Sequence, residues 1–258
     1  MKLRLFLLGG QDLEMLEIKN LLNIIPDSLV LDNQLIWENA ELSSYEVALQ
    51  EYGNKKDVDI YGIELRENTT PIPKNYHRID HHNDFNTKLS SLEQIAETFY
   101  IDLSREQKFI AANDNGYIPA MQKLGATPDE IKRIRFRDKQ AQGITMADEL
   151  NAELSIMNKT IEQGVDVVKT LSNRFSPICD RMFPYQKLLI YTNRELVYYG
   201  QNKDNLTTRY QEAIKIGKMY HGGGKYGYIG TVQGVYSEKQ ILSIKNKIIQ
   251  LLNPKHHE

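Results

Sequence analysis

Hydrophobic residues in the first half of the chain fall in short runs, and each run is followed by a segment with helical spacing. Residues 3–8 form an apolar run closed by Gly9 and Gly10, which is typical of a strand buried on both faces of a parallel sheet. Residues 12–25 then carry apolar side chains at helical spacing up to Pro26. The same alternation predicts strands at 28–32, 58–65 and 76–80 and helices at 43–53, 91–100 and 104–114. We therefore expect an α/β domain with a parallel sheet and helices on both faces.

The second half has a different pattern. Residues 127–171 are helical in pattern, with caps at Thr127 and Thr145, and Pro177 and Pro184 indicate the end of a linker. Two short strands, a helix, a glycine-rich loop and a final amphipathic helix follow, which together predict a small α+β module. The expected domains are an N-terminal parallel-sheet domain (1–145), a helical connector (146–183) and a smaller C-terminal α+β domain (184–258).

The composition is that of an ordinary globular protein. The chain has 258 residues, of which 41% are hydrophobic and 26% charged, enough to bury a real core. A net charge of -2 gives no global basic field for long nucleic acid. The only cysteine, Cys179, excludes an intramolecular disulfide and a cysteine-rich zinc site and fits a reducing cytoplasm.

The N-terminal run is too short for a signal peptide and lacks a small-residue cleavage site. No run approaches the ~18–20 apolar residues of a membrane helix. We therefore expect a cytoplasmic location and no membrane partner.

Acidic residues and histidines follow the predicted strands at the same end. Ligands of a parallel sheet gather at the carboxyl ends of its strands, so side chains from separate segments should meet there. Taken singly, each has an ordinary structural explanation, such as a helix N-terminal acid, but their joint order is hard to attribute to chance. Carboxylates and imidazoles together suit manganese or a related divalent ion. The set is Asp12, Glu14, Glu64, Asp80, His81, His82 and Asp114.

The tetrapeptide "IDHH" at residues 79–82 resembles the signature of the DHH phosphoesterases, and residues 90–118 are similar to the stretch that follows it in that family. The glycine-rich stretch at 221–230 is similar to the substrate loop of the family's C-terminal domain. The resemblance covers nearly the whole chain. The family includes manganese pyrophosphatases, single-strand exonucleases, short-oligonucleotide hydrolases and cyclic-dinucleotide phosphodiesterases.

The resemblance implies a role for each residue of the set. Glu64 would bridge two metal ions, Asp80 would orient His81 from behind, and His82 would lie towards the substrate phosphate. The implied metal ligands are Asp12, Glu14, Glu64, His81 and Asp114.

The glycine-rich stretch would bind substrate. Glycines allow backbone amides to approach an anion closely, and Tyr226 and Tyr228 could stack on a base. The alternative is a flexible hairpin loop. The implied substrate-binding residues are His221, Gly222, Gly223, Gly224 and Lys225.

The sequence departs from the family pattern in its first motif. The family usually has a histidine just ahead of the first acidic pair, where Gly9, Gly10 and Gln11 stand here, and Glu14 and Glu64 replace shorter aspartates. The loss of the histidine weakens one of two expected metal sites. His77 is a minor candidate to replace it.

The resemblance implies a phosphoesterase that uses Mn²⁺, with Mg²⁺ or Co²⁺ as alternatives. It would act on a small nucleotide or short single-stranded oligonucleotide held between the two domains. A pyrophosphate or polyphosphate hydrolase and a catalytically degenerate nucleotide-binding protein are the alternatives, and a homodimer stays open. The basic run Arg133, Arg135 and Arg137 is interpreted as a solvated face, with a phosphate contact as the alternative.

Overall fold

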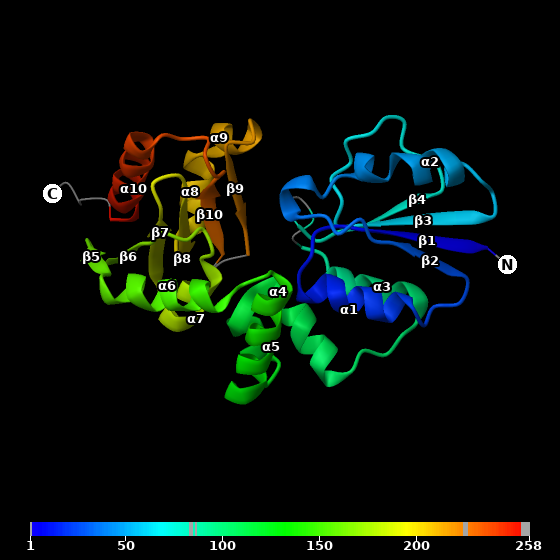
Figure 1. Ribbon diagram of the computed structural model, residues 1–258, viewed down its shortest axis with the longest axis horizontal. Coiled ribbons are helices and arrows are strands. Elements are labelled where there is room, and N and C mark those ends of the chain that lie inside the picture. Colours follow the sequence, from blue (N-terminus) through cyan, green and yellow to red (C-terminus); the bar gives the residue numbers. More distant parts are fainter. Residues whose placement is uncertain (1, 83–84, 86, 224–226, 254–258) are drawn as a thin grey trace. The chain divides into compact units, whose positions relative to one another are not determined.

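The computed structural model describes residues 2–82, 85, 87–223 and 227–253. The chain divides into two compact units, Met1–Gly143 and Ile144–Glu258. Each unit is built around one β-sheet with helices packed against it (Figure 1). Among the described residues, none of the helices has the length and apolar character needed to cross a bilayer.

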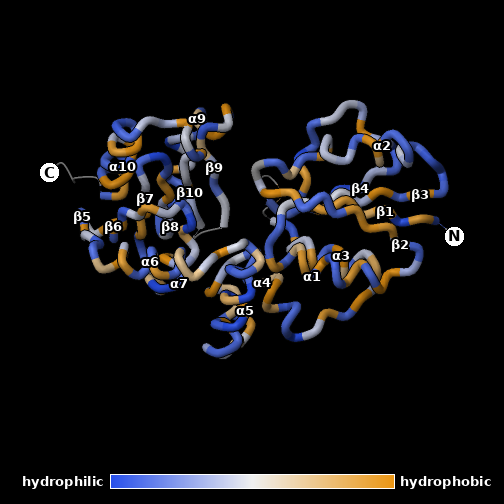
Figure 2. The backbone as a smooth tube through the Cα atoms, viewed as in Figure 1, coloured by the Kyte–Doolittle hydropathy of each residue, from blue (hydrophilic) through white to orange (hydrophobic). Residues whose placement is uncertain are grey.

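The first unit contains a four-stranded parallel sheet in the order β2-β1-β3-β4. The strands β1 and β3 are central, and their apolar colouring in Figure 2 agrees with burial on both faces. The strand bounds are Leu3–Leu8 for β1, Ser28–Leu31 for β2, Val58–Ile63 for β3 and Tyr76–Ile79 for β4. All four were expected from the apolar runs.

Helices cover both faces of this sheet. The helix α2 lies on one face, where Leu42, Tyr45 and Ala48 pack against Leu5 and Ile60. The helices α1 and α3 lie on the other (Figure 1). The bounds are Leu13–Leu22 for α1, Glu46–Tyr52 for α2, Ser91–Phe99 for α3, Arg105–Lys123 for α4 and Pro128–Ala141 for α5, with 3₁₀ turns η1 at Trp37–Asn39 and η2 at Leu42–Tyr45.

The second unit contains a six-stranded sheet in the order β5-β6-β7-β8-β10-β9, in which β6 and β7 are parallel and the other pairs antiparallel. Its strands are β5 Thr160–Glu162, β6 Val165–Lys169, β7 Lys187–Tyr191, β8 Leu196–Gly200, β9 Met219–Gly222 and β10 Tyr228–Thr231. Its helices are α6 Met146–Met157, α7 Ser176–Met182, α8 Lys203–Arg209, α9 Gln211–Lys215 and α10 Glu238–Leu252.

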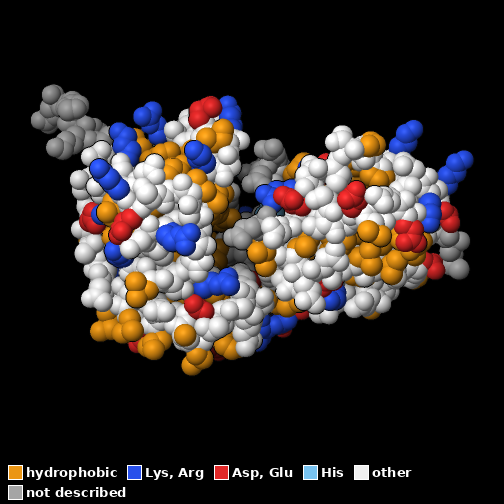
Figure 3. All heavy atoms as spheres, turned by 45° about the horizontal axis from the view of Figure 1, so that its top comes forward, with side chains coloured by type: hydrophobic (Ala, Val, Ile, Leu, Met, Phe, Trp, Pro, Cys, Tyr) orange, Lys and Arg blue, Asp and Glu red, His pale blue; other side chains and the backbone are white. Residues whose placement is uncertain are grey.

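Alternate residues of the central strands face opposite sides of this second sheet. Leu189 and Tyr198 pack with residues of α8 and α10, whereas Leu188 and Ile190 pack with residues of α6 and α7. Cys179 is buried in the latter cluster and acts as a core residue. On its outer side α6 exposes Met146, Leu150, Leu154 and Met157 (Figure 3).

The helical expectation for residues 160–169 is wrong, because these residues form the β5–β6 hairpin. Gln163 and Gly164 both have positive φ, at 49° and 75°, which is the geometry of a two-residue hairpin turn. The segment 146–183, expected as a helical connector, therefore contains two strands and belongs to the second unit. Pro177 lies in the first turn of α7, within the core rather than in a linker.

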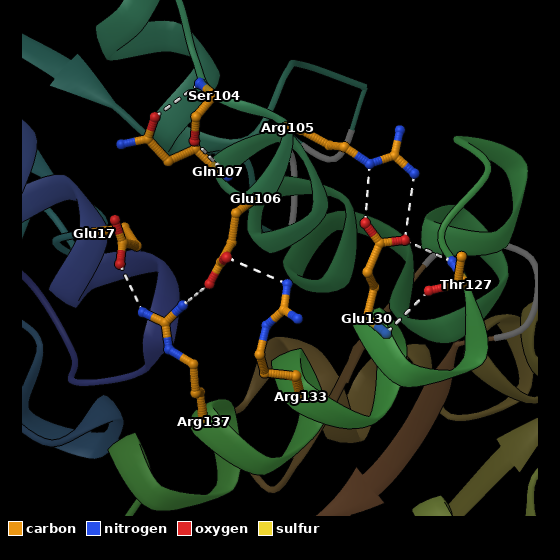
Figure 4. Close-up of polar contacts among 9 residues, drawn as sticks. All are labelled: Glu17, Ser104, Arg105, Glu106, Gln107, Thr127, Glu130, Arg133 and Arg137. Atoms are coloured by element: carbon orange, nitrogen blue, oxygen red, sulfur yellow. Dashed lines mark hydrogen bonds and ion pairs between the residues drawn. The ribbon is translucent and has the colours of Figure 1, made fainter.

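The basic run on α5 is neutralised within the first unit. Arg133 and Arg137 both pair with Glu106 of α4, and Arg137 also pairs with Glu17 of α1 (Figure 4). Arg135 points inward and is buried. These three arginines therefore join helices, and their contacts leave little reason to expect a phosphate-binding face.

Candidate metal centre

The strand register of the first unit brings the predicted polar residues to one edge of the sheet. Leu8, Ile63 and Ile79 lie side by side in β1, β3 and β4. The residues that follow them therefore emerge at the same carboxyl edge. Asp12 and Glu14 follow β1 at the start of α1, Glu64 follows β3, His81 and His82 follow β4, and Asp114 comes from α4.

Three carboxylates surround the His81 imidazole. Its Nε2 lies 2.7 Å from Asp114 Oδ2, 3.3 Å from Glu64 Oε1 and 3.4 Å from Glu14 Oε2. His81, Glu14 and Glu64 are almost fully buried, at 4%, 1% and 5% exposure. Carboxylates from three distant segments thus converge on a ring nitrogen that a fourth segment supplies.

His82 joins the same group from the more open side. Its Nε2 lies 3.6 Å from Glu64 Oε1, and its side chain is 34% exposed. One donor atom from each of Glu64, His81, His82 and Asp114 lies within 4.8 Å of the others. Both histidines of the predicted pair therefore have a nitrogen close enough to serve a common ion.

The buried donor atoms at this site fit a divalent cation. They approach one another at ion-pair distances, yet none has a hydrogen-bond partner among the described residues. Buried polar groups are normally satisfied, and a cation shared between them would meet that need. Carboxylate and imidazole donors suit Mn²⁺ and related ions. The atoms are Glu14 Oε2, Glu64 Oε1 and Oε2, His81 Nε2, His82 Nε2 and Asp114 Oδ2.

The pKa values of the two buried glutamates are shifted in opposite directions. Burial, reinforced by Asp114, raises the pKa of Glu14 to about 8. Burial would also raise the pKa of Glu64, but His81 and His82 outweigh it and hold that pKa well below its usual range. Without a metal, the site therefore keeps some carboxylates neutral and others ionised.

The pKa values of both histidines are raised, because the neighbouring carboxylates favour the charged imidazolium form. Burial would lower the pKa of His81, but Asp114, Glu14 and Glu64 together raise it far above its usual value. Glu64 likewise overcomes burial at His82 and raises its pKa to about 9. Protons thus occupy nitrogen atoms that a metal ion would need.

Asp12 caps the helix that carries Glu14. Its Oδ1 accepts a hydrogen bond from the Met15 backbone N–H at 2.8 Å. Burial first, and then the charges of Asp114 and Glu64, raise the pKa of Asp12 well above its usual value. Asp12 is therefore close to the centre and shapes its field, and its role as a metal ligand stays a prediction.

Asp80 contacts the main chain at the turn between the strand and the histidines. Its Oδ1 accepts a hydrogen bond from the His82 backbone N–H at 2.9 Å, and burial raises its pKa. This contact fixes the turn that carries both imidazoles. The expected role of Asp80 in orienting the His81 ring stays a prediction.

Glu64 reaches the site through an unusual backbone conformation. Its φ is 53°, a left-handed value that non-glycine residues seldom adopt. Its N–H donates to the Ile79 carbonyl at 2.8 Å, and a Cβ added to Gly9 would lie 2.6 Å from the carbonyl oxygens of Ile63 and Glu64. Gly9 therefore lacks a side chain because this turn passes directly over it.

Trp37 explains the second glycine of the first motif. A Cβ added to Gly10 would lie 2.6 Å from the Trp37 ring atom Cδ2. A histidine has no room at either glycine with this backbone. Trp37 was missed by the sequence reasoning, and the signal that could have found it was a lone tryptophan in a polar loop.

A break in α4 sets the position of Asp114. Gly116 and Tyr117 leave helical geometry two and three residues after Asp114, and Tyr117 has a φ of 59°. The guanidinium of Arg135 lies 4.6 Å from the Tyr117 ring centre and donates to Asn113 Oδ1 at 3.1 Å. Arg135 also pairs with buried Asp138. The buried arginine thus braces the turn that presents Asp114.

His77 does not replace the family histidine. Its imidazole stacks on Tyr61, pairs with Asp59 at 3.3 Å and is half exposed. It therefore lies on the sheet face, outside the group of donor atoms.

The described residues of the predicted substrate-binding stretch lie at the end of β9 and directly after it. His221 and Gly222 end β9, and Gly223 has a φ of 72°. Gly224, Lys225 and Tyr226 lie outside the described residues. Tyr228 stands opposite Gly222, and its half-buried ring lies near those of Tyr199 and Tyr220.

A two-unit α/β architecture with a carboxylate–imidazole centre at the carboxyl edge of a parallel sheet is thus established by the geometry. No protein-family model matches the sequence, and no curated protein does. Among solved structures, a DHH domain described as a member of a family of ribosomal proteins is similar over 96% of this chain and 87% of its own, with a TM-score of 0.55 and 10% identity. The chain therefore has the fold of a DHH-domain protein, which confirms the expected fold class.

Two manganese-bound structures are also similar at lower scores. RecJ from Thermus thermophilus in complex with Mn²⁺ is 9% identical with a TM-score of 0.46, over 95% of this chain and 51% of its own. An exonuclease RecJ bound to manganese is 9% identical with a TM-score of 0.41, over 97% of this chain and 90% of its own. The fold assignment rests on the DHH domain, whose TM-score is higher.

Proposed function

We propose that this protein is a metal-dependent phosphoesterase that hydrolyses a phosphate ester or phosphodiester bond of a small nucleotide or short oligonucleotide. The observation that carries the proposal is the convergence of six buried, unsatisfied donor atoms from Glu14, Glu64, His81, His82 and Asp114. The DHH-type fold supports the same class of reaction.

The buried residues would hold the metal, with Mn²⁺ as the ion of choice. Glu64 offers both oxygens, and Glu14, His81 and Asp114 offer one atom each. When bound, divalent ions of this kind activate a water nucleophile and neutralise charge on the phosphoryl oxygens. Glu14 uses its other oxygen to accept the Leu92 backbone N–H at 3.1 Å, so that its free oxygen is fixed towards the centre.

His82 is suited to meet the substrate. It is the most exposed member of the group, and while its Nε2 faces Glu64, its other ring nitrogen, Nδ1, can donate to a phosphoryl oxygen. The Asp80 contact with the His82 backbone holds the turn from which the ring projects. We propose that His82 donates to the substrate phosphate while the buried residues hold the metal.

One observation favours a binding protein without turnover as the second candidate. Gly9 and Gly10 leave no room for a histidine at either position, and the family that the sequence resembles usually has one in this stretch. If a second metal ion is needed and has no ligand, the same centre would bind a nucleotide phosphate without cleaving it.

A substrate panel separates these functions. Protein supplemented with Mn²⁺ would be incubated with a dinucleotide, a cyclic dinucleotide, pyrophosphate and a chromogenic phosphodiester, and metal content would be measured in parallel. We expect turnover of a nucleotide diester. Bound metal without turnover would favour the binding protein, turnover of pyrophosphate alone would favour a pyrophosphatase, and the absence of both metal and turnover would refute a metalloenzyme.

A further inference from the structure

The lone tryptophan of the chain is fixed beside the metal centre by its backbone. Gly10 pairs with Leu35 in an isolated bridge, and the Gln11 N–H donates to the Leu35 carbonyl at 3.1 Å. Trp37 follows two residues later at the start of η1. The segment that carries the indole is thus tied to the chain just before Asp12.

One face of the Trp37 ring lies over Gly10, and Trp37 as a residue is still exposed. A Cβ built on Gly10 would lie 2.6, 2.9 and 2.9 Å from the ring atoms Cδ2, Cε2 and Cε3. Three ring atoms at nearly equal distance mean that the indole lies with its face over Gly10. The residue nevertheless stays 41% exposed, so the contact with Gly10 leaves a large part of Trp37 open to solvent.

The indole continues a row of rings that leads into the site. Trp37 meets His82 edge to face, with ring centres 5.2 Å apart and an angle of 84° between the planes. The centres of His82 and His81 are 4.3 Å apart. A group stacked on the open face of Trp37 would therefore lie next to the residues proposed to bind phosphate and metal.

We propose that Trp37 is a stacking platform for the nucleobase whose phosphate is bound at the metal centre, an inference that rests on the proposed function. Every base offers a flat π-face, and stacking on an aromatic ring tolerates any base. Trp37 lacks conformational freedom because Gly10 and His82 hold it, which lowers the entropic cost of binding. Stacking on Trp37 favours a nucleotide over a phosphate that carries no base, and it does not discriminate between the bases.

The experiment compares ligands with and without a base. The single tryptophan makes fluorescence specific for residue 37, so AMP should quench it in the Mn²⁺-loaded protein. Calorimetry would measure the affinities of AMP and ribose 5-phosphate for the wild type and for Trp37→Ala, Trp37→Leu and Trp37→Phe. We expect Trp37→Ala and Trp37→Leu to weaken AMP binding roughly 5- to 100-fold and Trp37→Phe to weaken it less.

The controls separate this inference from the proposed function. Mn²⁺ affinity and ribose 5-phosphate affinity should be unchanged in all three variants. Equal losses for both phosphates, unchanged AMP binding in Trp37→Ala, or the absence of quenching by AMP would each overturn the platform. If the wild type binds neither ribose 5-phosphate nor Mn²⁺ while AMP still quenches Trp37, the metal-centre proposal fails and the platform stands.

Discussion

The carboxyl edge of the first sheet and the glycine-rich hairpin of the second unit were both expected to be functional, but their polar groups and glycines have different surroundings in the structure. The sheet edge gathers Glu14, Glu64, His81 and Asp114 from four separate segments into a cluster whose buried polar atoms lack hydrogen-bond partners among the described residues. The hairpin is a local structure in which Gly222 makes room for Tyr228. Buried charged groups without hydrogen-bond partners are costly, and they indicate a binding or catalytic site. Gly222 is explained by its packing against Tyr228, so no ligand is needed to account for it.

The strongest test of this contrast is His81→Ala, with His77→Ala as its control. His81 is the ring on which the three carboxylates converge, and His77 is a half-exposed histidine of the same sheet. We expect His81→Ala to abolish Mn²⁺ binding and to lower turnover by roughly 10³-fold or more. His77→Ala should keep both within about twofold. Metal analysis and initial rates check this, and a His81→Ala protein with full activity would remove the metal-site assignment.

A second test uses the cost of burying the Glu14 carboxyl group among other carboxylates. Glu14→Gln keeps the oxygen that accepts the Leu92 N–H and removes one buried carboxylate. We expect Mn²⁺ affinity to fall by about 100-fold, while the Tm of the metal-free protein rises by about 2–4 °C, the equivalent of ~1 kcal/mol. Calorimetric titration and thermal unfolding measure the two effects. A lower Tm together with unchanged Mn²⁺ affinity would mean that Glu14 is a structural residue.

Substitutions in the β9–β10 hairpin should change the stability of the second unit and leave Mn²⁺ binding unchanged. A Cβ at Gly222 would lie 2.6 Å from the Tyr228 hydroxyl oxygen, so Gly222→Ala should destabilise the second unit by about 1–3 kcal/mol and leave Mn²⁺ binding intact. Adding Tyr228→Phe removes that hydroxyl and should restore part of the loss. Denaturant unfolding monitors both variants. A Gly222→Ala protein that has normal stability but no longer binds nucleotide would mean that the hairpin is part of the substrate-binding site.

The smallest expected effect is a dependence on pH. The folded, metal-free protein holds the pKa of Glu14 at about 8 and that of His82 at about 9, above their ordinary values of 4.5 and 6.5. Between the ordinary and the raised pKa, the folded protein binds more protons than the unfolded protein, so stability falls as the pH rises. The metal-free Tm should therefore fall between pH 6.5 and 9. Mn²⁺ needs the deprotonated donors.

The rise in Tm caused by Mn²⁺ should therefore grow over the same range, with protons released on binding at pH 7. Thermal scans at a fixed Mn²⁺ concentration, and titrations in buffers of different ionisation enthalpy, measure these effects. A Mn²⁺-dependent shift that shrinks with pH would contradict the protonation scheme. Glu14→Gln should flatten part of the dependence and provides the matched control.

The sequence predicted the parts of the fold that depend on local pattern. Continuous apolar runs marked all four strands of the first sheet, and serine and threonine caps marked the starts of α3, α5 and α6. The β5–β6 hairpin was missed because its strands are short and its turn rests on a positive φ at Gln163, a residue type that seldom signals a turn.

The convergence of the polar side chains at one sheet edge could be predicted because topology alone brings the strand ends together, without knowledge of side-chain packing. Trp37 and Arg135 could not be found in this way. The role of Trp37 depends on a loop folding back over Gly10, and that of Arg135 on a helix break at Gly116. Both are tertiary contacts that leave no periodic trace in the sequence.

The close pairing of Gly9 with the left-handed Glu64 has an evolutionary consequence. The two residues are 55 positions apart, yet the carbonyl of one stands where a side chain on the other would be. A lineage that gains a side chain at position 9 must first reroute the chain at position 64, and a lineage that relaxes position 64 loses the reason for glycine at position 9. Substitutions at these two positions should therefore be inherited as a pair, and intermediates that carry only one of them should be rare.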